Sequence, residues 1–79
     1  MWKEGCVGIP KKDGSYEAFR YVVKLFDEPS RFGIDGGRIS KLQVTQKGKV
    51  VIHFDRGWDV KPTTETEQIV LELLLKEYN

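Results

Sequence analysis

Alternation of apolar residues over a dozen positions is the feature that most limits how this chain can fold. In Ser15–Phe26, SYEAFRYVVKLF, the apolar residues Phe19, Tyr21, Val23 and Leu25 occupy every second position. Successive side chains of a β-strand point to opposite faces of a sheet, so these four residues fall on one face. The stretch therefore predicts a long strand whose odd-numbered side chains point toward the core.

Three further strands are expected beside this one, and tight turns connect them. They span about residues 2–9, 38–46 and 49–56. The first is the weakest of them, because its two glycines have no side chain to pack in a strand interior. Turn residues such as proline, aspartate and glycine lie between the expected strands, which indicates an antiparallel meander.

Two of these strands predict finer detail. Between residues 38 and 46 the apolar positions break strict alternation, which predicts a β-bulge near Ser40–Lys41. In the stretch KVVIHFDR the alternation is regular. Val50, Ile52 and Phe54 are therefore expected on the core face of this strand, and His53 on the outer face.

The last part of the chain predicts a helix from about residue 64 to residue 78. Thr63 or Thr64 is expected to be the N-cap, and Glu67, three residues after Thr64, fits a capping box with it. Apolar residues cover well over half of the helix circumference, whereas a surface helix needs a stripe only about 100° wide. Either a strongly curved sheet wraps the helix, or a second partner, such as another copy of the chain, covers its flank.

These elements predict one small α+β domain over residues 1–79. The expected architecture is a three- to four-stranded antiparallel meander sheet with one C-terminal helix packed on one face. The core is expected to contain Phe19, Tyr21, Val23, Leu25, Leu42, Val44, Val50, Ile52, Phe54, Val70, Leu74 and some of Leu71, Leu73 and Leu75.

Composition excludes several classes of protein. The chain is 39% hydrophobic and 32% charged, which is typical of a soluble globular protein and argues against disorder. Its longest apolar run is three leucines, so we expect no membrane span, and the N-terminal residues do not resemble a signal peptide. The single cysteine, Cys6, cannot form an internal disulfide, which indicates a cytoplasmic protein.

Residues that could perform catalysis or bind a metal are few. His53 and Asp55 would share one face of the fourth strand, but metal sites usually need three or four ligands. Cys6 and His53 have no identifiable oxyanion donor. The glycine-rich stretch GIDGG, residues 33–37, lacks the phosphate-loop pattern, so its glycines are expected to allow a sharp turn or a close backbone approach. We expect no enzymatic activity, no cofactor and no metal.

The loops carry residue types that are common in protein interfaces. Tryptophan and arginine are over-represented among interface hot spots, although Trp58 could instead cover the open end of the core. The leading hypothesis is a small protein-interaction module that binds an unidentified protein or a second copy of itself. Its candidate contact residues are Arg31, Phe32, Arg38, Arg56, Trp58 and Asp59.

The outer face of the sheet suggests an alternative, which is weak binding of single-stranded nucleic acid. Basic groups beside aromatic residues on an exposed sheet are the usual surface for such a ligand. Residues 1–61 carry twelve Lys and Arg against eight Asp and Glu, a net charge of +4, which supports this alternative only weakly. Its candidate residues are Arg20, Lys24, Arg38 and Lys41 for phosphates and Tyr16 for stacking on a base.

Two stretches of sequence also resemble a known group of proteins. FGIDGGRISKL (Phe32–Leu42) and FDRGWD (Phe54–Asp59) are similar to motifs of a family of short uncharacterised proteins from Gram-positive bacteria, their phages and their conjugative elements. The resemblance covers most of the chain. It implies a bacterial, cytoplasmic setting and assigns no activity to any residue.

Overall fold

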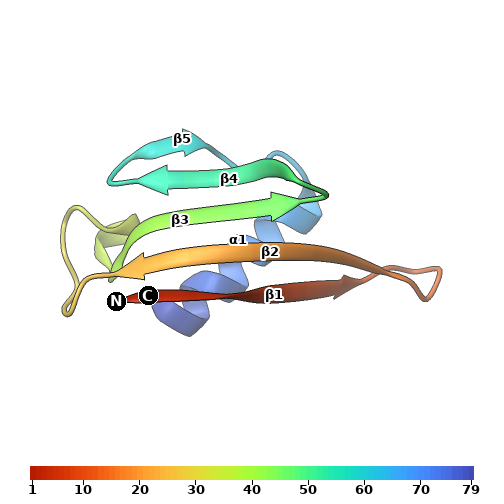
Figure 1. Cartoon of the computed structure of the whole chain (residues 1–79), viewed down its shortest axis with the longest axis horizontal. Coiled ribbons are helices and arrows are strands. Elements are labelled where there is room, and N and C mark those ends of the chain that lie inside the picture. Colours follow the sequence, from red (N-terminus) through yellow and green to blue (C-terminus); the bar gives the residue numbers. More distant parts are fainter.

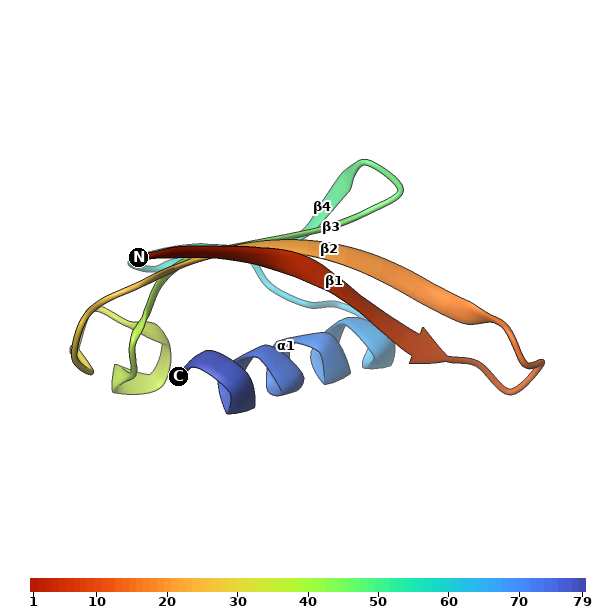
Figure 2. The same ribbon diagram turned by 60° about the horizontal axis from the view of Figure 1, so that its bottom comes forward.

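The five strands of the sheet follow one another in chain order, and each is antiparallel to its neighbours. This computed structural model describes all of residues 1–79. Its single α-helix crosses beneath the sheet from β4 to β1 and leaves the other face uncovered (Figures 1 and 2). The strands are β1 (Trp2–Pro10), β2 (Tyr16–Leu25), β3 (Ile39–Gln46), β4 (Lys49–Asp55) and β5 (Trp58–Val60), with a 3₁₀ turn η1 (Ile34–Gly36) before β3 and the helix α1 (Glu65–Tyr78) at the end.

The predicted α+β class and antiparallel meander are confirmed, but the prediction of three to four strands is wrong. The fifth strand, β5, has only three residues and pairs with the end of β4 through Phe54 and Trp58. So short a strand has no room for an alternating pattern. At the other edge, β1 joins the sheet along its whole length, with an unbroken register against β2.

Bulges decide which side chains of β3 and β4 face the core. The bulge predicted near Ser40–Lys41 is confirmed, because Ile39 and Lys41 both pair with consecutive residues of β2 and Ser40 has no partner there. A second bulge in β4 was not predicted. It leaves Val51 unpaired and rotates it into the core, while Val50 lies exposed on the outer face. The prediction that Val50 is a core residue is therefore wrong.

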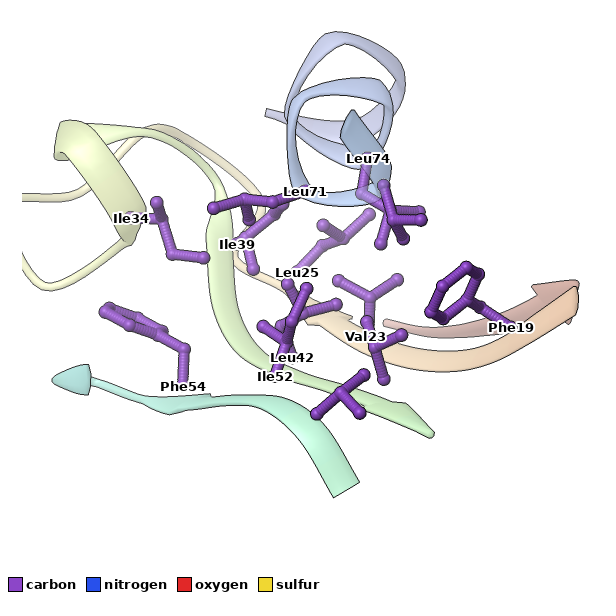
Figure 3. Packing of buried hydrophobic residues seen from close by; sticks show 13 residues of the cluster. Phe19, Val23, Leu25, Ile34, Ile39, Leu42, Ile52, Phe54, Leu71 and Leu74 are labelled. Atoms are coloured by element: carbon purple, nitrogen blue, oxygen red, sulfur yellow. The ribbon is translucent and has the colours of Figure 1, made fainter. Parts of the chain in front are cut away.

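The core lies between the sheet and α1 (Figure 3). Tyr21 and Leu75 are half-buried beside it, and Leu73 is exposed rather than buried, because it lies on a flank of α1 that no strand covers. Ile34, Ile39 and Val51 belong to the core although the sequence did not predict them there. The buried cluster comprises Phe19, Val23, Leu25, Ile34, Ile39, Leu42, Val44, Val51, Ile52, Phe54, Val70, Leu71 and Leu74.

The predicted N-cap of α1 is confirmed, with one change in its partner. Thr64 Oγ1 accepts a hydrogen bond from Glu67 N at 3.0 Å, as a capping box requires. Glu67 Oε1 reaches one residue further back than expected and accepts from Thr63 N at 2.9 Å. This bond explains how a glutamate can be buried at this position. The helix is neither long nor apolar enough to cross a membrane.

Candidate functional site

Most of the predicted contact residues lie at one end of the sheet. The β2–β3 loop (residues 26–38) and the β4–β5 turn (residues 55–58) are both at this end, together with Met1 and Trp2 (Figure 1). Backbone bonds between Met1 and Leu25, at 2.8 and 3.2 Å, hold the N-terminus beside the loop. We call these residues the loop end. The β1–β2 and β3–β4 turns, at residues 11–15 and 47–48, form the opposite hairpin end.

The base of the β2–β3 loop is closed by hydrogen bonds that use one of the predicted contact residues. Phe26 N donates to Arg38 O at 2.7 Å, and Arg38 Nε donates to Phe26 O at 3.2 Å. Ser30 N donates to Gly37 O at 2.9 Å a little further out. Arg38 therefore supports the loop and lies outside the strands, not on the outer sheet face where the nucleic-acid alternative needs it.

The glycine-rich part of the loop packs tightly against the end of α1. Asn79 Oδ1 accepts from Ile39 N at 3.1 Å, and Asn79 Nδ2 donates to Ile34 O at 2.9 Å. A Cβ on Gly37 would lie 2.2 Å from the Asn79 side chain, and a Cβ on Gly33 would lie 2.2 Å from Gly37 O. Both glycines are buried. The close approach expected of GIDGG is therefore present, and it lets Ile34 enter the core (Figure 3).

A pair of tyrosines fixes the last turn of α1 to β2. Tyr21 Oη and Tyr78 Oη lie 2.7 Å apart, with their rings tilted and 5.8 Å between centroids. This hydrogen bond, aided by burial, raises the pKa of Tyr21 to about 12. Together with Asn79, the pair holds the end of the helix against both the sheet and the loop. We call the three residues Tyr21, Tyr78 and Asn79 the helix-end clamp.

The tip of the same loop is open to solvent. Phe32 is 54% exposed, and the guanidinium carbon of Arg31 lies 5.0 Å from the centre of its ring. A cation held over an aromatic face forms a weak attraction that favours one arrangement of the pair. Arg31 and Phe32 thus form an exposed cationic and aromatic tip one residue before the buried Gly33.

The β4–β5 turn positions Trp58 and Arg56 differently. Arg56 has a positive φ of 54° and its backbone N donates to Ser40 O at 3.1 Å, which ties the turn to the β3 bulge. Trp58 packs edge-on against Phe54 with 5.1 Å between ring centroids, yet 36% of it stays exposed. Its indole therefore covers part of the core, as one interpretation of the sequence predicted, and still presents a surface.

A shallow basic hollow adjoins this turn. It has a volume of about 240 Å³, and Lys24, Lys41 and Arg56 line it together with Ser40. Asp55 lies 3.8 Å from both Lys41 Nζ and Arg56 Nε, so it partly neutralises the hollow. Exposed ion pairs at this distance contribute little to stability, which leaves these cations available to a partner.

The outer face of the sheet carries the residues of the nucleic-acid alternative in separate places. Lys24 and Lys41 are cross-strand neighbours near the loop end, and Arg20 lies further along β2. Tyr16 lies at the hairpin end, about 26 Å from Lys24 at the usual rise per residue of a strand. Glu4 and Asp55 share this face, so its basic character is weak.

The aromatic residue beside these lysines is Trp2, which sequence reasoning missed. Lys24 Nζ lies 5.6 Å from the centre of the Trp2 ring, and Trp2 is 57% exposed. A signal for it was present: Trp2 lies an even number of residues from Cys6 in a strand whose odd positions carry Val7 and Ile9. Because residues 2–9 formed the least certain strand, the pattern was too weak to place Trp2.

The titratable groups do not converge on one point. His53 Nδ1 lies 2.9 Å from Asp59 Oδ2, not beside Asp55, because a bulge in β5 brings Asp59 next to the outer face. This pair is largely open to solvent. No group of three or more His, Cys, Asp and Glu side chains lies close enough to hold a metal ion.

Comparison with known proteins gives one match. A family model described as a domain of unknown function, DUF7678, matches residues 1–79, so the chain belongs to this family. No curated protein and no solved structure matches it.

Proposed function

We propose that this member of the DUF7678 family is a non-enzymatic protein-interaction module that binds its partner through the loop end. The observation that supports this most is the gathering of exposed aromatic and basic residues at one end of the sheet. Phe32, Trp58 and Trp2 come from three separate segments, and each is more than a third exposed. Of the six other aromatic residues, Phe26 is half-buried in the β2–β3 loop, and the remaining five lie elsewhere or are buried, as Tyr16 and Phe54 illustrate.

The chemistry of the loop end indicates the kind of partner. Tryptophan and arginine dominate the binding energy of many protein interfaces, because they bury a large area and still form directed polar contacts. The loop end carries Arg31, Arg38 and Arg56 against Asp27, Glu28, Asp35 and Asp55, and with Lys24 and Lys41 of the adjoining basic hollow the basic residues exceed the acidic ones by one. We expect a partner surface with an apolar centre and one or two carboxylates that face the basic hollow.

Site-specific photo-cross-linking in the host cell tests this proposal. A photoreactive amino acid would replace Phe32 or Arg56 at the loop end and Lys12 or Lys47 at the hairpin end. All four positions are exposed, so the two pairs are matched in accessibility. We expect both loop-end positions to give the same cross-linked protein and neither hairpin-end position to give it. Cross-links from the hairpin end alone, or unrelated proteins from Phe32 and Arg56, would contradict the proposal.

Weak binding of single-stranded nucleic acid is a second candidate, and the contact between Lys24 and Trp2 favours it. An exposed indole beside Lys24 and Lys41 provides a stacking surface next to two phosphate-binding cations. A hollow of about 220 Å³, lined in part by Trp2, Lys41 and His53, adjoins them. Amide shifts of residues 2, 24 and 41 on titration with a short single-stranded DNA, lost as salt is raised, would support this candidate. Unmoved amides at low salt would eliminate it.

The cellular setting that we propose follows from the sequence. A single cysteine suits the reducing cytoplasm, and the GIDGGRISKL and DRGWD motifs are similar to those of proteins from Gram-positive bacteria and their mobile elements. Localisation of a fluorescent fusion in such a host would test this setting.

A further inference from the structure

The two edges of the sheet are protected very differently. At one edge, β5 has three residues and a bulge at Asp59, both of which discourage further strand pairing. At the other edge, β1 has nine residues and no bulge, and its charged residues and proline (Lys3, Glu4 and Pro10) lie toward its ends, which leaves Gly5–Ile9 without either. Natural proteins usually block so long an edge with charges, proline or a covering segment. The helix α1 lies beneath β1 and does not block its edge (Figure 1).

The Met1–Leu25 pair shows which residues of β1 form backbone hydrogen bonds with β2 and which face the free edge of the sheet. Met1 and Leu25 exchange two backbone bonds, and Lys11 N donates to Ser15 O at the far end. In an antiparallel ladder such pairs recur at every second residue, so the odd-numbered residues of β1 bond to β2. The even-numbered residues therefore direct their N–H and C=O groups to the free edge. They are Trp2, Glu4, Cys6, Gly8 and Pro10.

We propose that β1 pairs antiparallel with β1 of a second copy of the chain, centred on Cys6. This dimer would join two five-stranded sheets into one continuous sheet across a two-fold axis. The proposal concerns the β1 edge and is independent of the loop end.

The register follows from the composition of the strand. Cys6 is the midpoint of Trp2–Pro10, so centring the pair there gives the longest overlap. Glu4 then faces Gly8 of the partner, and Trp2 faces Pro10, which lacks an N–H and needs no acceptor. No like charges face each other. A register centred on Glu4 would place two carboxylates opposite each other, which is destabilising.

The exposed flank of α1 supplies a second, separate reason. Leu71 packs beside Ile34 and Ile39 (Figure 3). At 100° per residue, Leu73 lies about 200° around the helix from Leu71, so it faces away from η1. Ile69, one turn before Leu73, is on the same flank, and the two residues are 37% and 45% exposed. Because η1 lies at the loop end, we infer that this flank faces the half of β1 nearer the hairpin end.

The two-fold axis would place both helices on one face of the joined sheet. Their Ile69 and Leu73 flanks would then approach each other in antiparallel orientation below the paired β1 strands. Burying such a stripe explains why apolar residues cover more of α1 than its own sheet can bury. Edge pairing and helix packing thus predict the same dimer.

The native cysteine reports directly on the register. In the proposed pair the two Cys6 α-carbons lie about 5.5 Å apart, within the range that a disulfide spans. We expect rapid and nearly complete covalent dimer when the protein is treated with diamide, which takes up the two thiol hydrogens. In the control variant Cys6→Ser/Ala18→Cys, the only thiol is at residue 18 of β2, which is also exposed but lies one strand away from the proposed interface. We expect this control to cross-link only slowly.

Sedimentation velocity over a range of concentrations measures the dimer without a covalent bond. Gly8→Pro removes an edge-directed N–H from each copy, and we expect the dissociation constant to rise about tenfold or more because two hydrogen bonds across the interface are lost. Gly8→Ala keeps the N–H, and its Cβ would meet only the Tyr16 ring at 3.5 Å, so it should dimerise normally. Leu73→Glu should weaken the dimer, whereas Gln68→Glu, at an exposed position about 140° around α1 from Leu73, should not.

The results that support the β1 dimer differ from those that overturn it. A monomer at every concentration up to the millimolar range would overturn the proposal. A dimer that tolerates Gly8→Pro and cross-links no faster through Cys6 than through residue 18 would also overturn it, because its interface would lie elsewhere. Circular dichroism of Gly8→Pro and Leu73→Glu shows whether each variant remains folded. A folded monomeric Gly8→Pro beside a dimeric Gly8→Ala supports the β1 interface.

Discussion

The GIDGG stretch and the DRGWD stretch look alike in sequence and differ completely in structure. Both are short, polar and glycine-containing. Gly33 and Gly37 of the first are buried, and an added Cβ would overlap the Gly37 carbonyl or the Asn79 side chain. Gly57 of the second is exposed and has no atom within 4 Å of its added Cβ. One stretch is a packing device, whereas the other is open to solvent.

This difference shows that a distinctive motif can be required either for packing or for binding. The glycines of GIDGG are required because backbone and side chain approach each other closely, so the stretch needs no ligand to explain it. In DRGWD, Trp58 packs against Phe54 and Asp59 bonds to His53, whereas the Arg56 side chain is 65% exposed. Binding is therefore better sought at Arg56 and Trp58 than at the glycine-rich loop.

The largest effect is expected from Gly33→Ala, compared with Gly57→Ala. At Gly33 the new methyl group would lie 2.2 Å from a backbone oxygen, and the loop would have to move. We expect a loss of about 3 kcal/mol in the free energy of unfolding, at the upper end of overpacking costs. Gly57→Ala should change it by less than about 0.5 kcal/mol. Urea denaturation measures both, and equal losses would remove the distinction between the two stretches.

Asn79→Ala should have the next largest effect. It removes the partners of Ile39 N and Ile34 O, and each unsatisfied buried group costs about 1–3 kcal/mol unless water reaches it. Because the Asn79 side chain is what a Cβ on Gly37 would meet, Gly37→Ala should cost less in the Asn79→Ala background than in the native chain. Strictly additive losses in this double-mutant cycle would show that the two residues do not interact.

Trp58→Ala should affect stability less and binding more. The indole is partly exposed, and its edge-on contact with Phe54 contributes about 1 kcal/mol beyond the area that it buries. We expect a modest fall in the urea midpoint together with loss of the cross-linked partner obtained from Phe32 or Arg56. A folded Trp58→Ala variant that retains the cross-link at full yield would exclude Trp58 from the binding surface.

High pH should weaken the helix-end clamp and leave the DRGWD turn unaffected. The pKa of Tyr21 is raised to about 12, whereas a tyrosine in the unfolded chain ionises near pH 10. The folded state thus favours the neutral phenol. Its contribution is complete below about pH 10 and is lost as the pH rises to about 12. The fall in denaturation midpoint over this interval should be shallower in Tyr21→Phe, and an identical fall would contradict this assignment.

The sequence predicted those parts of the fold that are determined by residues close together in the chain. The alternation in β2, the capping residues of α1 and the bulge at Ser40 were all readable from neighbouring residues. The bulge at Val51 was not, because Val50 and Val51 are both apolar and either could face the core. Ile34 was missed because it lies in a glycine-rich loop, outside any alternating or helical pattern of apolar residues.

The geometry of the candidate site depended on contacts that no local pattern contains. The sequence indicated Arg31, Phe32, Arg56 and Trp58 by residue type, and the meander brings their two loops to one end of the sheet. It could not show that Asn79 bonds to a residue 45 positions earlier, or that Arg38 supports the loop base. Trp2 beside Lys24 likewise depends on the β1–β2 register.

The order of the strands has a consequence for how the chain folds. Every strand pairs with its neighbour in the sequence, and such local contacts usually allow fast folding. The helix-end clamp is different, because Tyr21 and Tyr78 are 57 positions apart. Hairpins should therefore form early and the end of α1 should dock last. In the native state, amide hydrogen exchange at Ile39, whose N–H bonds to Asn79, would report transient release of this docking before the central strands open.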